Sequence, residues 1–225
     1  MDEMRVLTSS PLFAGINGAE AAAMLRCLSP YQRSFHAGGT ILRAGEAAVG
    51  MGLVLEGSVR LEHVDAWGGR RILERFEPGA TFAEAYACAA GEPLLVDVVA
   101  ETDCTVLFLD AARVLRPCPS ACAYHARLVR NLLAEMAKKN LLLSRKIRLI
   151  TPRTIRGRLL AYLSGEVVRH GARTFDIPFD RQQLADYLAV ERSALSAELS
   201  KMRREGLIEC HKSRFTLLTN VDGER

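Results

Sequence analysis

The spacing of apolar residues changes abruptly after Pro119, and this change constrains the fold more than any other feature of the chain. From Val129 to Ile150 a row of side chains, all but one apolar, recurs at alternating steps of four and three residues. That heptad period is typical of a long helix that packs against another helix. We therefore predict a helix over 119–150. Its seam comprises Val129, Leu133, Met136, Asn140, Leu143, Ile147 and Ile150.

Two kinds of partner could cover this seam. Asn140 falls at a heptad a position, where a polar side chain fixes the register of a two-stranded coiled coil at some cost in stability. We favour a second copy of the chain, which makes 119–150 a dimerisation helix. The alternative is that the helix packs only on the domain before it, because about 25 residues is near the lower length limit for a coiled coil.

Upstream of this helix, from Gly38 to Leu109, glycine-containing turns separate short runs rich in valine, leucine and isoleucine. Short strands spaced by roughly 8 to 12 residues are typical of a sandwich or barrel-like β unit. A short helix over 18–28 is expected to precede this unit. The N-terminal part of the chain is therefore predicted to be mainly β.

The residues after Thr151 follow the order of a winged helix-turn-helix, in which a helix, a tight turn, a second helix and a β-wing succeed one another. Asp180 is the predicted N-cap of the first of these helices, and Gln183 stands at the capping-box position. Gly206 is expected to end the second helix. The predicted elements are a helix that begins beyond Thr151 and ends in the turn around His170-Gly171, helices over 181–188 and 191–205, and strands over 207–209 and 215–218.

The helix over 191–205 carries side chains suited to reading DNA in the major groove. Arginine can donate two hydrogen bonds to guanine, glutamate can accept one from cytosine, and serine suits phosphates or base edges. Basic residues farther along are expected to neutralise phosphates. The alternative is a solvated, charged helix in a helical hairpin. The predicted DNA-binding residues are Arg181, Gln182, Glu191, Arg192, Ser193, Ser196, Lys201 and Arg204.

Charge is distributed unevenly along the chain. Residues 1–137 hold 12 Lys and Arg against 16 Asp and Glu, whereas residues 138–225 hold 18 against 10. The C-terminal part is therefore basic although the net charge of the whole chain is only +4. This asymmetry favours a polyanionic partner for the C-terminal part, and double-stranded DNA is the expected one.

Composition places the chain among folded proteins that do not span a membrane. It is 49% apolar and 25% charged, which supplies enough residues for a core. Its first five residues carry acid, and charged residues interrupt every apolar stretch before it could cross a bilayer. We therefore expect a cytoplasmic protein without a membrane partner. The 6 cysteines are too sparse for a disulfide scaffold, so we expect reduced thiols.

Several stretches of the sequence resemble one known family. Residues 181–188, RQQLADYL, and the following ERSALS at 191–196 resemble the DNA-binding signature of the Crp/Fnr superfamily of bacterial transcription regulators. Four segments upstream look like the cyclic-nucleotide-binding β-roll of that superfamily. They are GTI at 39–41, GE at 45–46, LVLEGSV at 53–59 and PGATFAE at 78–84.

This resemblance covers nearly the whole chain and implies an α+β protein in three parts. A sensory β-roll, which is a double-stranded β-helix, would occupy residues 1–118. The dimerisation helix would follow over 119–150, and the winged helix-turn-helix DNA-binding domain over 151–225. The implied function is an effector-responsive transcription regulator that acts as a homodimer on a palindromic operator, with RNA polymerase as an expected partner.

The sequence departs from the family where cyclic AMP would bind. Members that bind it carry a Gly-Glu pair and, about ten residues on, an Arg-Ser or Arg-Thr pair that holds the phosphate. Here Ala83 precedes Glu84, Leu94-Leu95 stand ten residues later, and no Lys or Arg lies between Arg75 and Arg113. Each missing charge-assisted bond is worth about 1.5–3 kcal/mol. We therefore expect no cyclic-nucleotide binding.

The effector is then an unknown small molecule. Glu84 either bonds such a ligand or makes a structural contact at its turn, and the sequence leaves both open. The candidate effector pocket comprises Phe82, Glu84, Leu94, Leu95, Leu128 and Leu132.

Cofactor-binding members of the superfamily provide a second comparison. Iron–sulfur sensors gather several N-terminal cysteines, whereas this chain has only Cys27 before Cys88, so we expect no cluster and no other metal site. Cys118 and Cys122 form the one close pair, either as a redox couple or as small residues packed at a helix start. The histidines show no ligand spacing, although His125 could ligate haem. A haem- or thiol-based redox regulator therefore stays an alternative.

The sequence disfavours two further functions. A sensory module without DNA binding, resembling a kinase regulatory subunit, is disfavoured by the helix-turn-helix signature. No nucleophilic elbow, Walker loop, zinc-protease motif or carboxylate pair is present, so we do not expect an enzyme. Ala197 stands where close relatives often have Arg after the serine that Ser196 matches, so a relative's operator cannot be assumed.

Overall fold

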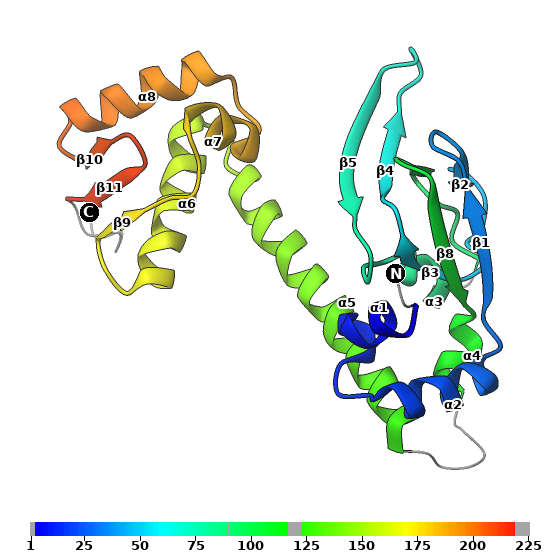
Figure 1. Cartoon of the computed structure of the whole chain (residues 1–225). Coiled ribbons are helices and arrows are strands. Elements are labelled where there is room, and N and C mark those ends of the chain that lie inside the picture. Colours follow the sequence, from blue (N-terminus) through cyan, green and yellow to red (C-terminus); the bar gives the residue numbers. More distant parts are fainter. Residues whose placement is uncertain (1–2, 90, 117–122, 219–225) are drawn as a thin grey trace. The chain divides into compact units, whose positions relative to one another are not determined.

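The computed structural model describes residues 3–89, 91–116 and 123–218 of the chain. It divides the chain into two compact units, 1–139 and 140–225, and the division falls inside the long helix α5 (Ala123–Ile150; Figure 1). The predicted domain limits at 118/119 and 150/151 follow the ends of the long helix instead, and they stay predictions.

Helical segments open the first unit: α1 (Glu3–Ser9), the 3-10 turn η1 (Pro11–Phe13) and α2 (Gly18–Leu28). The helix predicted over 18–28 is thereby confirmed. Asn17 starts it with a capping box, because its Oδ1 accepts from the Glu20 N–H at 2.9 Å and the Glu20 carboxylate accepts from the Asn17 N–H at 3.0 Å.

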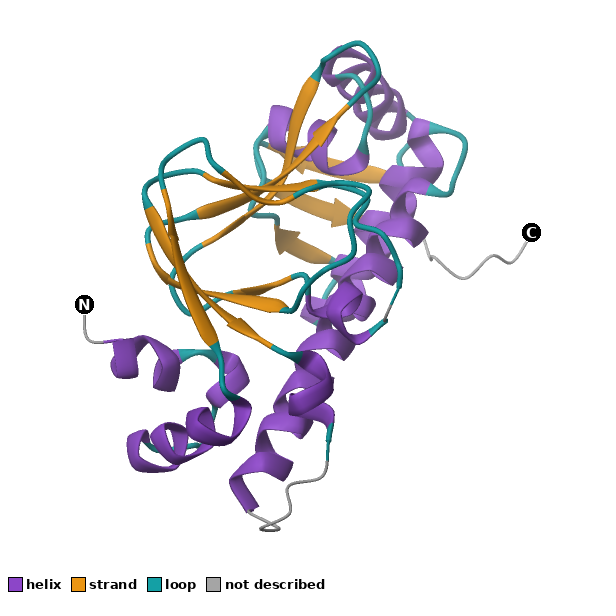
Figure 2. Cartoon of the chain, turned by 90° about the vertical axis from the view of Figure 1, so that its right-hand side faces the viewer, coloured by secondary structure: helices purple, strands orange, loops and turns teal. Residues whose placement is uncertain are grey.

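Two antiparallel four-stranded sheets form the β part of the first unit, with strands in orange in Figure 2. Apart from β4 and β5, which follow one another in the chain, neighbouring strands come from separate parts of it, so the chain winds back and forth between the sheets as a β-roll, as predicted. One sheet has the order β1 (Tyr31–Phe35), β8 (Cys104–Leu109), β3 (Met51–Glu56) and β6 (Thr81–Phe82). The other has the order β2 (Thr40–Leu42), β7 (Asp97–Ala100), β4 (Val59–Val64) and β5 (Arg70–Phe76).

Aromatic rings pack against one another in the core of the roll. The rings of Phe82 and Phe108 pack edge to face with their centroids 6.4 Å apart. The Phe82 ring centroid lies 5.9 Å from that of Phe76. The Phe82 ring also lies against the backbone of Gly52, where a Cβ atom would come within 2.1 Å of the Phe82 Cζ. Only glycine therefore fits at position 52 while Phe82 keeps this place.

Two short helices complete the first unit, α3 (Glu84–Cys88) and α4 (Ala111–Leu115). A second apolar cluster joins α1 and α2 to β3 and α5, and it contains the buried side chains of Leu128 and Leu132. One face of α5 from Tyr124 to Met136 is thus packed within the first unit.

The predicted helix over 119–150 is confirmed from Ala123 onward, and residues 119–122 lie outside the described part. The predicted seam does not coincide with the buried face of this helix. Leu133, Leu143 and Ile147 are 67%, 62% and 60% exposed, Asn140 is exposed as well, and the remaining seam residues are partly buried. Along this chain alone, the helix therefore shows a row of large apolar side chains to solvent.

The second unit has the elements of a winged helix-turn-helix, as predicted. The helices are α6 (Ile155–His170), α7 (Arg181–Leu188) and α8 (Arg192–Arg204), and the strands are β9 (Thr174–Asp176), β10 (Ile208–His211) and β11 (Arg214–Leu217). The strands form one antiparallel sheet in the order β10-β11-β9. Strand β9 was not predicted, because three residues are too few to show the alternation of apolar and polar side chains that marks a strand.

The second unit has its own core. Both helices of the helix-turn-helix contribute buried side chains to it: Leu184, Ala185, Leu188, Leu195, Leu199 and Met202. Within the described residues, no helix is long and apolar enough to cross a lipid bilayer.

Candidate functional site

Helix α7, which precedes the turn to α8, is held at both of its ends. Asp180 caps α7 as predicted, since its Oδ1 accepts from the Gln183 N–H at 2.8 Å and the Gln183 Oε1 accepts from the Asp180 N–H at 2.9 Å. At the other end, the Arg158 guanidinium from α6 donates to the carbonyls of Leu188 and Ala189 at 3.0 and 2.8 Å. Hydrogen bonds therefore hold both the start of α7 and the first residues of the turn to α8.

A second arginine of α6 holds the far part of α8. Arg156 donates to the Glu198 carboxylate at 2.6 Å and to the Glu205 carboxylate at 3.0 Å. The paired carboxylates raise the pKa of Arg156, and the guanidinium in turn lowers the pKa of Glu205. Sequence reasoning missed Arg156 and Arg158, because contacts across 30 or more residues leave no periodic signal.

Glu191 takes a position that the sequence analysis did not foresee. It is the N-cap of α8, whose first residue is Arg192 rather than Glu191. The two carboxylate oxygens accept from the backbone N–H groups of Ser193 and Ala194 at 2.9 and 2.8 Å, and the Ser193 hydroxyl donates to the same carboxylate. These bonds lower the pKa of Glu191. The carboxylate shapes the start of the helix, and its contact with a cytosine stays a prediction.

The other predicted DNA-binding residues differ in whether their side chains make hydrogen bonds within their own helices. Arg192, Lys201 and Arg204 are exposed along α8. The Ser196 hydroxyl donates to the Arg192 carbonyl at 3.0 Å, and the Gln182 amide donates to the Asp186 carboxylate at 2.9 Å. The serine hydroxyl and the glutamine amide therefore already have partners within their helices.

Arg181 links the first helix of the motif to the wing. Its guanidinium lies over the ring of Phe215 in β11, 5.2 Å from the ring centroid. Its Nη1 is buried and has no hydrogen-bond partner among the described residues. The side chain is therefore placed by packing, with one donor left for a further acceptor.

The wing adds basic side chains that were not among the predicted contacts. An open depression of about 400 Å³ beside β10 and β11 is lined by Arg203, Glu209, Cys210, His211, Arg214 and Thr216. The exposed basic residues of α8 and of the wing thus belong to the same unit as the helix-turn-helix.

The six residues of the predicted effector pocket fall into different environments. Phe82 and Leu94 lie in the core between the sheets, whereas Leu128 and Leu132 lie in the core beneath α1 and α2. Leu95 is 74% exposed. The structure therefore places these residues in separate packed clusters, and their role in binding an effector stays a prediction.

Glu84, the remaining residue of that set, makes a structural contact. Its buried carboxylate pairs with the ammonium group of Lys139 from α5. The Lys139 Nζ also donates to the Thr81 carbonyl at 3.2 Å and lies 5.6 Å from the centroid of the Phe76 ring. Ala83, which stands where the family has glycine, adopts the left-handed conformation with a φ of 58°. Lys139 was missed because its partner is 55 residues away.

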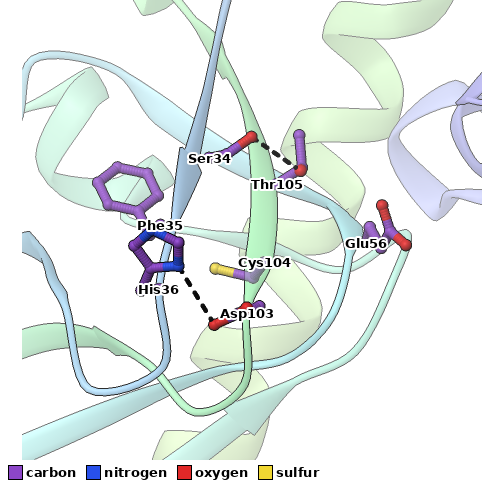
Figure 3. A pocket seen from close by; sticks show the side chains of 7 residues that line it. All are labelled: Ser34, Phe35, His36, Glu56, Asp103, Cys104 and Thr105. Carbon is purple, nitrogen blue, oxygen red and sulfur yellow. Dashed lines mark hydrogen bonds and ion pairs between the residues drawn. The ribbon is translucent and has the colours of Figure 1, made fainter.

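A separate depression of about 260 Å³ opens beside β1 and β8, as Figure 3 shows. Its lining includes His36, whose Nδ1 lies 3.7 Å from the Asp103 Oδ1, and the hydroxyls of Ser34 and Thr105, which are 3.2 Å apart. The Cys104 thiol also lines it, and burial raises the pKa of that thiol, which keeps it protonated and a poor nucleophile. None of these residues belongs to the predicted pocket.

The structure describes four of the cysteines and the histidine named in the cofactor hypotheses. Cys118 and Cys122 lie outside the described residues, and the described cysteines, Cys27, Cys88, Cys104 and Cys210, are free thiols. His125 is buried, and its Nε2 lies 2.7 Å from the Val114 carbonyl, so it donates there. In the described ranges, no three His, Cys, Asp or Glu side chains are arranged to hold a metal ion.

Comparisons with known proteins agree with this architecture. Residues 32–118 match the cyclic nucleotide-binding domain family, and residues 157–223 match the Crp-like helix-turn-helix domain family. The chain is 24% identical over 203 residues to "Transcriptional activator protein FnrL" of Cereibacter sphaeroides, covering 84% of this chain and 77% of that protein. It is 26% identical over 216 residues to "Probable transcriptional regulator flp" of Lacticaseibacillus casei, covering 95% and 94%.

Among solved structures, the chain is similar to the N-terminal domain of a transcriptional regulator from Streptomyces coelicolor A3(2). The two are 24% identical with a TM-score of 0.51, over 61% of this chain and 94% of that one, which supports the fold of the first unit. With a cyclic nucleotide-binding domain followed by a Crp-like helix-turn-helix, the chain belongs to the Crp/Fnr superfamily of DNA-binding transcription regulators.

Proposed function

We propose that this regulator binds a palindromic operator as a homodimer and responds to a small molecule other than a cyclic nucleotide. The observation that carries the proposal is the exposed row of Leu133, Leu143 and Ile147 on α5. Large apolar side chains in a heptad row gain most from burial against a second copy of the same row. Asn140, in the middle of that row, would face its symmetry mate and fix the register.

A two-fold dimer presents two copies of α8, and a two-fold operator is the DNA that fits them. Arg192, at the exposed N-terminal end of α8, is suited to a guanine edge. Lys201 and Arg204 lie farther along and are suited to phosphates. The capped start of α8 and its clamp by Arg156 hold these side chains on a rigid helix, which favours precise contacts.

The ligand is proposed not to be a cyclic nucleotide because the segment that holds the phosphate in the family carries no cationic side chain here. No Lys or Arg stands between Arg75 and Arg113, and Arg75 itself bonds the Glu101 carboxylate at 2.8 Å. Glu84, which would lie near such a ligand in the family, is already paired with Lys139. A phosphate brought next to Glu84 would be repelled by it.

We further propose that the protein works in the cytoplasm, where its DNA is, and that RNA polymerase is a partner. Both follow from the function of the family rather than from a feature of this chain.

Selection of bound sequences from random double-stranded DNA, followed by sedimentation equilibrium of the complex, tests the proposal. We expect an enriched motif with two-fold symmetry and a complex of two chains per duplex. An asymmetric motif bound by one chain would overturn the homodimer and its operator. The selection is carried out with and without cell extract as a source of ligand. If the folded chain enriches no motif in either case, sequence-specific binding is overturned.

A further inference from the structure

We propose that Glu84, the Thr81 carbonyl and the Phe76 ring form an ammonium-binding site, and that a ligand with a primary ammonium group occupies it by displacing Lys139. In the structure, Lys139 is itself the occupant of this site. The inference rests on the proposed function, since it names the chemical class of the small molecule.

The three groups around the Lys139 Nζ are those that recognise an ammonium ion. The Glu84 carboxylate supplies the opposite charge and is buried, with 5% of its side chain exposed. The Thr81 carbonyl, 3.2 Å from Nζ, accepts a second N–H, and the face of Phe76 attracts the cation. A neutral or anionic ligand would leave the buried carboxylate without a counter-charge, at a high energetic cost.

The site is open to exchange because its two partners differ in exposure. The Lys139 side chain is 39% exposed, so it can swing into solvent and leave Glu84 behind. The neighbouring Lys138 is a natural control, because it pairs with Glu135 on the same helix and 68% of its side chain is exposed.

Displacement would act on the dimer helix directly. Lys139 lies on α5, whereas Glu84 lies at the start of α3 in the roll, so their bond connects the ligand-binding part to the helix of the proposed dimer. A ligand that replaces Lys139 breaks this connection, and its effect on DNA affinity can be no larger than the difference between its binding free energies for the two dimer states.

Replacement of Lys139 by alanine vacates the site and allows a direct test. The atoms lost are those of n-propylammonium, which is therefore the probe, with n-propanol as the uncharged control. We expect calorimetry to show saturable binding of n-propylammonium to the Lys139→Ala chain. Binding should be at least about tenfold weaker in wild type, in Lys138→Ala and in the Lys139→Ala/Glu84→Gln double variant. Equal binding by Lys139→Ala and Lys138→Ala, or retained binding without the Glu84 charge, would overturn the site.

A measurement on the wild-type chain covers the case in which Lys139→Ala does not fold. The sequence holds only five lysines, so ¹³C labelling of the lysine Cε atoms yields a spectrum in which each can be assigned. Titration with n-propylammonium should move the Lys139 signal toward those of the exposed lysines while Lys138 stays unchanged. Identical shifts of both signals would contradict displacement. DNA binding and dimer mass, measured on the same samples, show separately whether the proposed function holds.

Discussion

The Glu191 carboxylate accepts a hydrogen bond from the backbone N–H of Ala194, with 2.8 Å between the Glu191 Oε2 and that nitrogen. Together with the bond from the Ser193 N–H, it satisfies two donors that the first turn of α8 would otherwise leave open. Its negative charge also lies at the positive end of the helix dipole. The first turn of α8, which carries Arg192, is therefore built around this side chain.

Replacement of Glu191 by alanine should lower the melting temperature and weaken binding to all operator variants alike, because the start of α8 frays. Replacement by aspartate or serine, which also cap helices, should recover most of the stability. A change of preference at one base position in Glu191→Ala, with the stability unchanged, would show instead that the carboxylate reads a base.

The same cap predicts a pH dependence. The pKa of Glu191 is lowered by its hydrogen bonds, so its contribution to stability is complete above the ordinary carboxyl range and is lost as the pH falls through the lowered value. The stability difference between wild type and Glu191→Ala should therefore be constant near neutral pH and shrink on acidification. Chemical denaturation at a series of pH values measures it, and a difference that grows toward acid would contradict the cap.

The seam predicts the effect of charge on the dimer. Replacement of Leu143 and Ile147 by aspartate should release monomer, because like charges would face one another across the proposed interface. Leu142 is equally exposed but lies outside the seam, so Leu142→Asp is the matched control and should stay dimeric. Sedimentation velocity measures the mass of each. An unchanged dimer in the double variant would place the interface elsewhere.

Cyclic AMP and cyclic GMP should bind only weakly, because no Lys or Arg fork is available for the phosphate. Isothermal calorimetry provides the measurement. A sub-micromolar dissociation constant would mean that backbone donors or a helix terminus replace the arginine.

Arg192 and Lys201 should differ in how they contribute to DNA binding. Arg192→Ala should cost about 1–3 kcal/mol on the preferred site and relax base preference at one position of each half-site. Lys201→Ala should weaken all sequences similarly and flatten the salt dependence. Operator variants measured at two salt concentrations separate the two roles. Base preference identical to wild type in Arg192→Ala would remove Arg192 from the residues that read the sequence.

Replacement of Ala189 by glycine should stabilise the protein. It ends α7 in the left-handed conformation with a φ of 53°, which disfavours any residue with a Cβ atom. After allowance for the more flexible unfolded chain, Ala189→Gly should raise the free energy of unfolding by about 0.5–1 kcal/mol. Ala197→Gly, in the interior of α8, should lower it by about 1 kcal/mol. Chemical denaturation compares the two, and destabilisation by both would show that the turn relaxes around alanine.

Much of the architecture could be read from local patterns. The capping box at Asp180 and Gln183, the heptad row from Val129 and the glycine-punctuated β runs each depend on residues within a few positions of one another. Such patterns report helix ends and the type and extent of secondary structure directly. The order of the elements followed from them, whereas the family was indicated by the resemblance of residues 181–196 and of four segments upstream.

The contacts that shape the sites depend on residues far apart in the sequence, and only the tertiary structure supplied them. Arg156 reaches Glu198 and Glu205, and Lys139 reaches Glu84, over separations of more than 40 residues. The sequence alone determined which helix carries the candidate DNA-reading residues and where the exposed apolar row lies. The tertiary structure decided that Glu191 caps α8 and that Glu84 already has a cationic partner. The reason is that a charged side chain with a buried or capping role takes whichever partner the fold brings within hydrogen-bonding distance, and no local period records that choice.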